Sequence, residues 1–248
     1  MAKVKEIAKK VPLLLPVYRM LRNRYISYQC YQLKAKDTDQ VFTDIYKNNK
    51  WGKNSASASG PGSDVHQTRI IVNKLPAVFS DFGISTILDI PCGDFYWMKN
   101  VDFVGIDYTG ADIVNELIEK NIEQYQRHGV HFQTLNLITD ELPKVDLVFC
   151  RDCLVHLSFE DIFCALKNLC NSQSKYILTT TFTRRTDNHD IATGQWRTLN
   201  LELAPFMLPR PLKVISEGCT EGGGNFSDKS LGLWRIADIR ECLTRRST

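Results

Sequence analysis

An apolar run that stops in a tight turn occupies residues 86–94, with the sequence TILDIPCGD. The β-branched and leucine side chains predict a buried strand, and the Pro-Cys-Gly-Asp that follows predicts a turn with an acid at its mouth. In open α/β sheets, ligands bind just beyond the carboxyl ends of strands. The stretch therefore predicts a ligand site as well as a fold class, with a nucleotide-like molecule as the first candidate ligand.

Strand and helix patterns alternate on both sides of this stretch. Strands are predicted at residues 86–91, 108–113, 130–135, 145–150, 175–181, 212–218 and 230–236. Helices are predicted at residues 67–79, 114–127 and 159–169. This alternation predicts an α/β fold with a doubly wound, mostly parallel seven-stranded sheet. Because no helix pattern separates the last two strands, we expect an antiparallel hairpin at one end of the sheet.

The composition is that of a globular protein. A length of 248 residues suits one domain with an extension, and 43% hydrophobic and 24% charged residues are ordinary values. No secretory signal pattern precedes the eight cysteines, so we interpret them as free thiols, several of them buried, in a reducing cytosol. Cys150 and Cys153 form a C-x-x-C pair, but no second pair completes a zinc site, and no metal is predicted.

The charge is distributed unevenly along the chain. Residues 1–36 carry nine basic side chains and one acidic side chain, a net charge of +8, so the remainder carries −5 of the total +3. A basic body surface for nucleic acid is therefore disfavoured. Apolar residues at helical spacing predict a basic amphipathic helical extension over residues 1–36, ahead of a catalytic domain at 37–248. The extension either lies on an anionic membrane surface or packs against protein, and its apolar runs are too short to span a bilayer.

A loop of small residues and glycines is predicted at residues 50–63. It is either a simple linker or a lid over a bound cofactor, with Trp51 as a stacking group.

Four motifs together resemble class I S-adenosylmethionine (SAM) dependent methyltransferases, and specifically one bacterial family associated with surface-polysaccharide and other glycan pathways. They are PCGDFYWM at 91–98, GADIV at 110–114, CRDCLVHL at 150–157 and NHDIATG at 188–194. The likeness covers about residues 41–236. Pro91 replaces a glycine of the general class I motif, and Asn136 stands where an aspartate is common. The resemblance implies a Rossmann-like class I methyltransferase fold and SAM as cofactor. A nicotinamide oxidoreductase is the weaker interpretation, because G-x-G-x-x-G is absent.

Cofactor contacts are expected at the strand ends. Gly93 permits close backbone approach, and Asp94 is expected to accept from the amino group of SAM. Asp112 and Asp107 compete for the ribose hydroxyls, and Asp112 is preferred because it leaves more chain for the crossover helix. The expected contacts are Asp89, Pro91, Gly93, Asp94, Trp97, Asp112, Ile113, Asn136, Leu137 and Arg151, with Asn136 reading adenine and Leu137 packing on it.

Catalytic and acceptor-binding residues are expected after the fourth and fifth strands. His156 follows Asp152 by four residues, so a helical turn would let the acid orient the imidazole as a base. Asp190 is the alternative base, and a metal held by Asp152, Asp187 and Asp190 is not demanded by the spacing. The polar loop that follows contains the expected acceptor contacts Asn188, Trp196, Arg197 and Asn200. Trp196 would stack on a sugar, and Arg197 would hold a phosphate or carboxylate.

The sequence therefore predicts a SAM-dependent O-methyltransferase that acts on a hydroxyl of a sugar or glycan, in the cytoplasm or at the inner membrane face. A methyltransferase for a small phosphorylated metabolite and a SAM-binding protein without catalysis are the alternatives.

Overall fold

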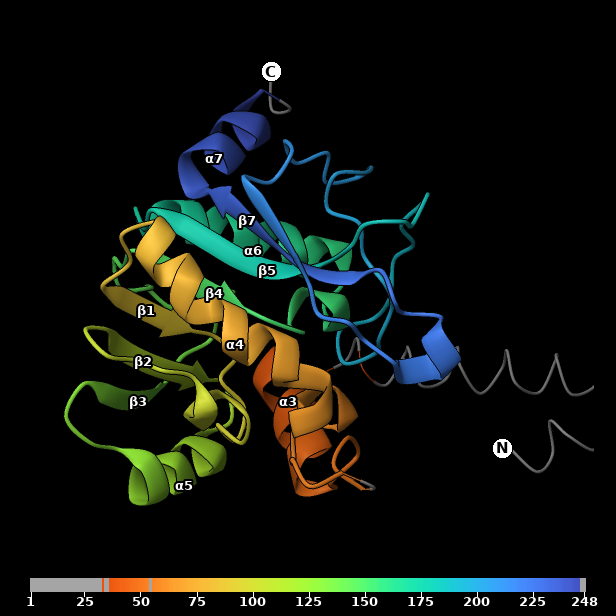
Figure 1. The fold of residues 1–248 in the computed structure, drawn as a ribbon. Coiled ribbons are helices and arrows are strands. Elements are labelled where there is room, and N and C mark those ends of the chain that lie inside the picture. Colours follow the sequence, from red (N-terminus) through yellow and green to blue (C-terminus); the bar gives the residue numbers. More distant parts are fainter. Residues whose placement is uncertain (1–32, 34–35, 54, 246–248) are drawn as a thin grey trace, which may run out of the picture.

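The protein is described by a computed structural model that covers residue 33, residues 36–53 and residues 55–245. Its centre is a seven-stranded sheet with the order β3-β2-β1-β4-β5-β7-β6 (Figure 1). The strands are β1 Thr86–Asp89, β2 Asp107–Asp112, β3 Val130–Thr134, β4 Leu147–Cys150, β5 Tyr176–Phe182, β6 Lys213–Ser216 and β7 Lys229–Arg235. Strands β1 to β5 pair in parallel, and β7 is antiparallel to both β5 and β6. The predicted sheet and its antiparallel end are confirmed.

Helices cover both faces of the sheet. They are α3 Thr38–Lys47, α4 Val65–Asp81, α5 Asn115–Tyr125, α6 Phe159–Asn171 and α7 Ile236–Thr244. The three predicted helices correspond to α4, α5 and α6, with ends that differ by a few residues. The sequence patterns did not predict α3 or α7, and the last predicted strand included the first residue of α7.

Two hydrophobic cores lie on opposite sides of the sheet, because successive side chains of a strand point to opposite faces. Leu88 and Val148 pack in the core that α6 and α7 cover. Ile87 and Leu147 pack in the core that contains the buried side chains of α4. Figure 1 shows α4 in front of the sheet and α6 behind it. Strands that are buried on both faces read as continuous apolar runs, which is why the sequence patterns located them closely.

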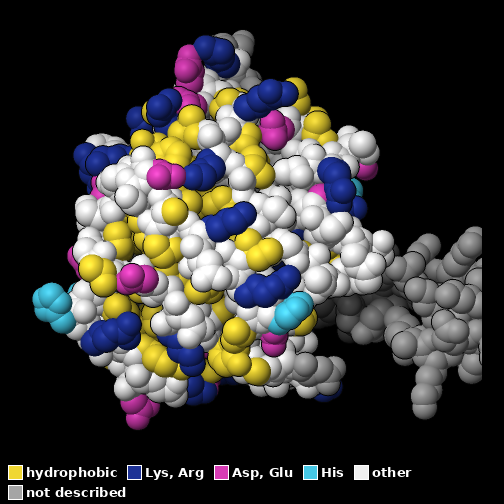
Figure 2. Space-filling model, viewed as in Figure 1, with side chains coloured by type: hydrophobic (Ala, Val, Ile, Leu, Met, Phe, Trp, Pro, Cys, Tyr) yellow, Lys and Arg dark blue, Asp and Glu magenta, His cyan; other side chains and the backbone are white. Residues whose placement is uncertain are grey.

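The basic N-terminal extension predicted for residues 1–36 lies almost entirely outside the described residues, so its helical form and its contacts stay predictions. Among the residues that are described, no helix combines the length and apolar character needed to cross a membrane. On the face drawn in Figure 2, the lysine and arginine side chains are scattered among other residues and do not form one basic patch.

Candidate functional site

A cavity of about 540 Å³ lies at the carboxyl ends of the parallel strands. Asp89, Asp112 and Arg151, at or just beyond the ends of β1, β2 and β4, line its floor. Helix α3 and residues 58–63 line it from the N-terminal part of the chain. The cavity thus occupies the position that open α/β sheets use for ligands.

From the loop predicted at residues 50–63, residues 50, 51 and 58–63 line this cavity, which favours the lid interpretation over the linker. Trp51 lines the cavity, and its ring lies against the imidazole of His156, with ring centroids 4.4 Å apart and planes at 31°. The loop is tied to the sheet by Asp94, whose carboxylate accepts from Ser57 Oγ at 2.9 Å and from Ala58 N at 2.7 Å.

Asp94 therefore has a structural function that differs from the predicted one. Its carboxylate oxygens are used by the backbone and hydroxyl donors of residues 57–59, and the residue does not line the cavity. The expectation that Asp94 accepts from the amino group of a cofactor is corrected accordingly. Beside it, Gly93 has a φ of +56°, and a Cβ there would clash with Ser59 Oγ, so the turn requires glycine.

Asp112 is the acid at the carboxyl end of β2, and it accepts from the backbone N–H groups of Gly93 at 3.2 Å and Val114 at 3.0 Å. Burial raises the pKa of Asp112 to about 6, against the opposing effect of these hydrogen bonds. Asp107 begins β2 at the opposite end of the sheet, is exposed, and does not line the cavity. Of the two acids, only Asp112 is placed to meet a ligand.

The other predicted cofactor residues differ in what their side chains contact. Pro91, Trp97, Ile113 and Leu137 line the cavity. Asp89 is buried and accepts from Tyr108 Oη at 2.6 Å, and burial raises the pKa of Asp89 to about 8. Asn136 lines the cavity, but its amide already bridges Asp39 Oδ1 and the backbone N–H of Ile138, both at 2.8 Å. This side chain connects α3 to the end of β3.

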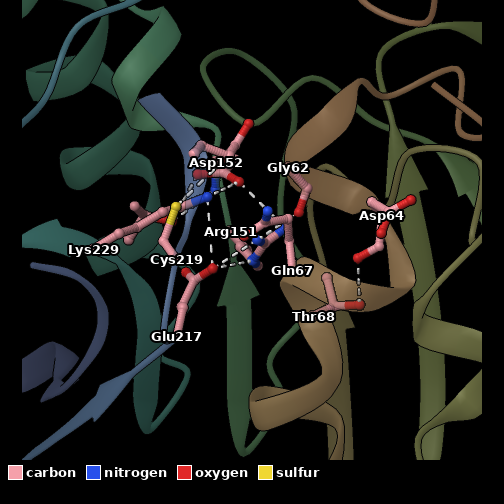
Figure 3. Close-up of polar contacts among 12 residues, drawn as sticks. Gly62, Asp64, Gln67, Thr68, Arg151, Asp152, Glu217, Cys219 and Lys229 are labelled. Atoms are coloured by element: carbon pink, nitrogen blue, oxygen red, sulfur yellow. Dashed lines mark hydrogen bonds and ion pairs between the residues drawn. The ribbon is translucent and has the colours of Figure 1, made fainter. Parts of the chain in front are cut away.

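Four charged side chains form a cluster beyond the carboxyl end of β4, and Figure 3 shows Arg151 at its centre. The Arg151 guanidinium donates to Glu217 Oε2 at 2.6 Å and to the Gly62 carbonyl at 2.8 Å, and it lies 3.2 Å from Asp152 Oδ2. Lys229 Nζ lies 2.6 Å from Asp152 Oδ2 and 3.5 Å from Glu217 Oε2. Burial acts to raise the pKa of Asp152, but the Lys229 and Arg151 charges outweigh it and hold that pKa well below its usual value. Asp152 is therefore ionised.

Sequence patterns missed Lys229 and Glu217, which are 5% and 1% exposed. Lys229 begins β7 and lines the cavity, while Glu217 follows β6 beneath it. The only local signal in the sequence was the position of these two charged residues, each next to an apolar strand. A charged residue that is buried there needs a partner of opposite charge, because charges are rarely buried alone.

His156 ends a short 3₁₀ turn, Leu154–His156, and lines the cavity. Its Nδ1 lies 2.8 Å from the carbonyl oxygen of Gln195. A carbonyl only accepts, so Nδ1 carries the proton and Nε2 is the basic nitrogen of the ring. Burial lowers the pKa of His156 to about 4, which keeps the ring neutral at pH 7. The group that orients the ring is thus Gln195 and not Asp152, which corrects that part of the prediction.

Among the loop residues predicted to meet the acceptor, Trp196 lines the cavity and three others do not. Arg197 is 2% exposed, and its guanidinium donates to the carbonyls of Leu154, Leu157 and His189 at 2.9, 2.7 and 3.2 Å. The guanidinium of Arg197 thus binds backbone carbonyls, and its N–H donors are not directed at a ligand in the cavity. The predicted contact with a phosphate or carboxylate is therefore corrected.

Asn188, Asn200 and Asp190 also have structural hydrogen bonds. Asn188 donates to the carbonyls of Asn200 and Ala204, and the Asn200 side chain donates to the Arg185 carbonyl. Asp190 accepts from the backbone N–H of Phe159 at 2.7 Å, at the start of α6, and it does not line the cavity. Within the described part of the chain, no three His, Cys, Asp or Glu side chains are grouped to hold a metal ion.

Comparisons with known proteins identify the fold. No family model matches the chain, and no curated protein matches its sequence. The solved structures that it resembles include human N-acetylserotonin methyltransferase in complex with SAM, with 14% identity, a TM-score of 0.52, and 81% of this chain matched to 60% of that one. Mitomycin 7-O-methyltransferase MmcR gives 14% identity and a TM-score of 0.53 over 72% of this chain and 55% of that one.

A third structure, the methyltransferase domain of bacterial CtHen1-C, gives 13% identity and a TM-score of 0.51, with 69% of this chain matched to 98% of that domain. The chain thus spans the whole of an isolated methyltransferase domain but only 55–60% of the two longer enzymes. Its fold is the Rossmann-like fold of class I methyltransferases.

Proposed function

We propose that this protein is a SAM-dependent methyltransferase that transfers a methyl group to a hydroxyl of a sugar or sugar-linked acceptor in surface glycan biosynthesis. The observation that carries the proposal is one cavity that joins Asp112 at the end of β2 to His156 beyond β4. An acid that can accept from a ribose and a neutral imidazole then share one enclosed space.

The residues at the β1–β3 end of the cavity fit SAM. The Asp112 carboxylate has lone pairs to spare for the two ribose hydroxyls, beyond its two backbone donors. Gly93 brings only backbone to the cavity, which leaves room for the methionyl part. Leu137 and Ile113 supply apolar surface for the adenine ring, with Phe42 of α3 as a third apolar side chain. SAM is expected to bind with its sulfonium toward β4.

When bound, SAM supplies a methyl group on a positively charged sulfur. An acceptor hydroxyl that takes this methyl group would have to lose its proton, so the protein has to supply a base beside the acceptor oxygen. The neutral His156 accepts this proton at Nε2, because Nδ1 is held by the Gln195 carbonyl. Trp51 covers the ring and limits the access of water to it.

The β4–β7 end of the cavity fits a hydroxylated ring. Asp152 and Lys229 line it with charged hydrogen-bonding groups, and Phe182 and Phe226 line it with aromatic surface. Pyranoses present hydroxyls at their edges and C–H groups on their faces. The charged side chains can bind the hydroxyls, and the aromatic rings can pack on the C–H faces. A small phosphorylated metabolite is the less favoured acceptor, because the predicted anion contact, Arg197, is consumed in the fold.

Calorimetry with SAM, S-adenosylhomocysteine (SAH) and NAD tests the cofactor. We expect micromolar binding of SAM and SAH and none of NAD; a chain that binds NAD and not SAM contradicts the proposal.

Mass spectrometry of glycans from a deletion strain and its complemented parent tests the acceptor. Loss of one O-methyl group from a sugar supports the sugar acceptor, and an unchanged glycan with a newly unmethylated metabolite supports the alternative. A protein that binds SAM but methylates no acceptor is a SAM-binding protein without catalysis.

For residues 1–36, we propose contact with an anionic membrane surface. Flotation with anionic liposomes, with and without this segment, tests it; equal flotation of both proteins contradicts it.

A further inference from the structure

Trp196 is unusual among the exposed apolar side chains of the described residues. Seven large hydrophobic side chains are exposed there, and Trp196, at 45%, is the only aromatic one and the only one that lines the cavity. A tryptophan that is left half open at the rim of a cavity has apolar surface that nothing in the described chain covers.

The indole ring is held firmly despite its exposure. It meets the rings of Phe226 and Phe182 at steep angles, 72° and 82°, with centroids 5.0 and 6.3 Å away. Its neighbours in sequence are fixed as well: the Gln195 carbonyl binds His156, and the Arg197 guanidinium binds three buried carbonyls. A ring anchored on both sides loses little entropy when a ligand stacks on it.

The size of the cavity shows why a ligand would reach this rim. A pocket for one drug-sized ligand measures about 300–1,000 Å³, and this cavity of about 540 Å³ lies within that range. SAM is itself such a ligand, and its expected contacts fill the β1–β3 end. The β4–β7 end is then left for the acceptor. Because Trp196 lines the cavity and is still 45% exposed, a part of the acceptor that extends beyond the β4–β7 end would lie over its ring.

Building on the function proposed above, we propose that Trp196 is the platform of a second sugar subsite, which binds the pyranose next to the one that is methylated. The acceptor is therefore an oligosaccharide or a growing glycan and not a monosaccharide. The apolar C–H face of a pyranose suits the electron-rich face of an indole. The Glu221 carboxylate lines the same cavity and receives only the weak thiol donor of Cys219, at 3.6 Å, among the contacts described, so it can accept from sugar hydroxyls.

A glycan array of mono- to hexasaccharides tests the proposal, with the SAH-saturated protein as the probe of each spot. Array members that bind are then titrated against the wild type, Trp196→Ala and Val214→Ala. Val214 is the matched control, because it is 47% exposed and lies on β6 away from the cavity. We expect oligosaccharides to bind and their monosaccharides to bind at least tenfold more weakly. Trp196→Ala should lose about tenfold in oligosaccharide affinity, and Val214→Ala should lose none.

Three results would overturn the second subsite: monosaccharides that bind as tightly as oligosaccharides, no bound glycan at all, or equal affinities for Trp196→Ala and Val214→Ala. Calorimetry with SAM on the same three proteins separates this failure from that of the proposed function. If all three bind SAM equally, a negative array result removes the subsite and leaves the methyltransferase proposal in place. If the wild type does not bind SAM, the proposed function itself fails. Trp196→Phe keeps an aromatic ring, so it should recover part of the affinity if stacking is the cause.

Discussion

Replacement of Lys229 by methionine should destabilise the protein by about 3–5 kcal/mol. The ammonium lies 2.6 Å from Asp152 Oδ2 and 3.5 Å from Glu217 Oε2, and Lys229 and Glu217 are almost fully buried. With an effective dielectric constant of about 20, these distances correspond to attractions of about 6 and 5 kcal/mol. The dehydration of the ammonium, several kcal/mol, offsets part of this gain. Methionine has a similar length, so the loss is one of charge and not of volume.

Urea unfolding of the ligand-free protein at pH 7, followed by circular dichroism and fluorescence together, measures the loss. Lys213→Met is the matched control. Lys213 lies 2.7 Å from Asp81 Oδ2, but the two side chains are 38% and 56% exposed, so this pair contributes at most about 1 kcal/mol. If Lys229→Met costs no more than Lys213→Met, the buried cluster does not stabilise the fold as argued.

A double variant tests whether restoring the balance of buried charge restores stability. Lys229→Met with Glu217→Gln removes one positive and one negative charge, and the remaining Arg151 and Asp152 stay paired. We expect it to recover at least half of the loss in the free energy of unfolding, because the buried charges are again balanced. A double variant that is no more stable than Lys229→Met alone would contradict the argument from charge balance.

The remaining predictions concern the cofactor, the base and the loop. Asp112→Asn should weaken SAM about tenfold or more in calorimetry, because a hydrogen bond to a charged acceptor is lost. In the wild type, SAM affinity should fall as the pH drops through about 6, where Asp112 takes up a proton, and in the variant it should not. His156→Ala should lower kcat by about 10²–10⁴ with SAM affinity unchanged, and the acid limb of the wild-type kcat profile, measured at saturating SAM, should lie near pH 4 and not near 6.5. Arg197→Met should cost about 3–6 kcal/mol in urea unfolding, because three buried carbonyls lose their donor.

The strands and the cavity floor were predictable from local patterns. Strand β4 is an apolar run that is buried on both faces. Asp112 ends a mostly buried strand, just before a helix pattern. The strand pattern and the position of the acid can each be recognised from a few neighbouring residues. Helix α3 was not predicted, because its apolar and aromatic residues, Val41, Phe42, Ile45 and Tyr46, span less than two turns of the helix. So short an apolar stripe gives little periodic pattern in the sequence.

Three of the polar residues that were predicted as ligand contacts bind groups of the protein itself. Asp94, Asn136 and Arg197 each suit a ligand by residue type. In the structure they bind a loop, a helix and backbone carbonyls, respectively. The pairing of Arg151 with Glu217 joins residues 66 positions apart, which no local pattern reveals. A polar residue beside a site can be required for the fold and not for a ligand, because buried backbone groups need hydrogen-bond partners.

The two halves of the cavity are built from separate parts of the chain, and this separation bears on how acceptors are chosen. The proposed cofactor half draws on β1 to β3 and α3, whereas the proposed acceptor half draws on residues after β4, on Trp196 and on the start of β7. Around Trp196, the Gln195 carbonyl sets the tautomer of His156, and Arg197 binds the carbonyls on either side of His156. The proposed base and the rim are thus positioned by one hydrogen-bonded segment. A change in this segment would alter the acceptor without disturbing Asp112, which is how a scaffold with functional loops acquires new specificity.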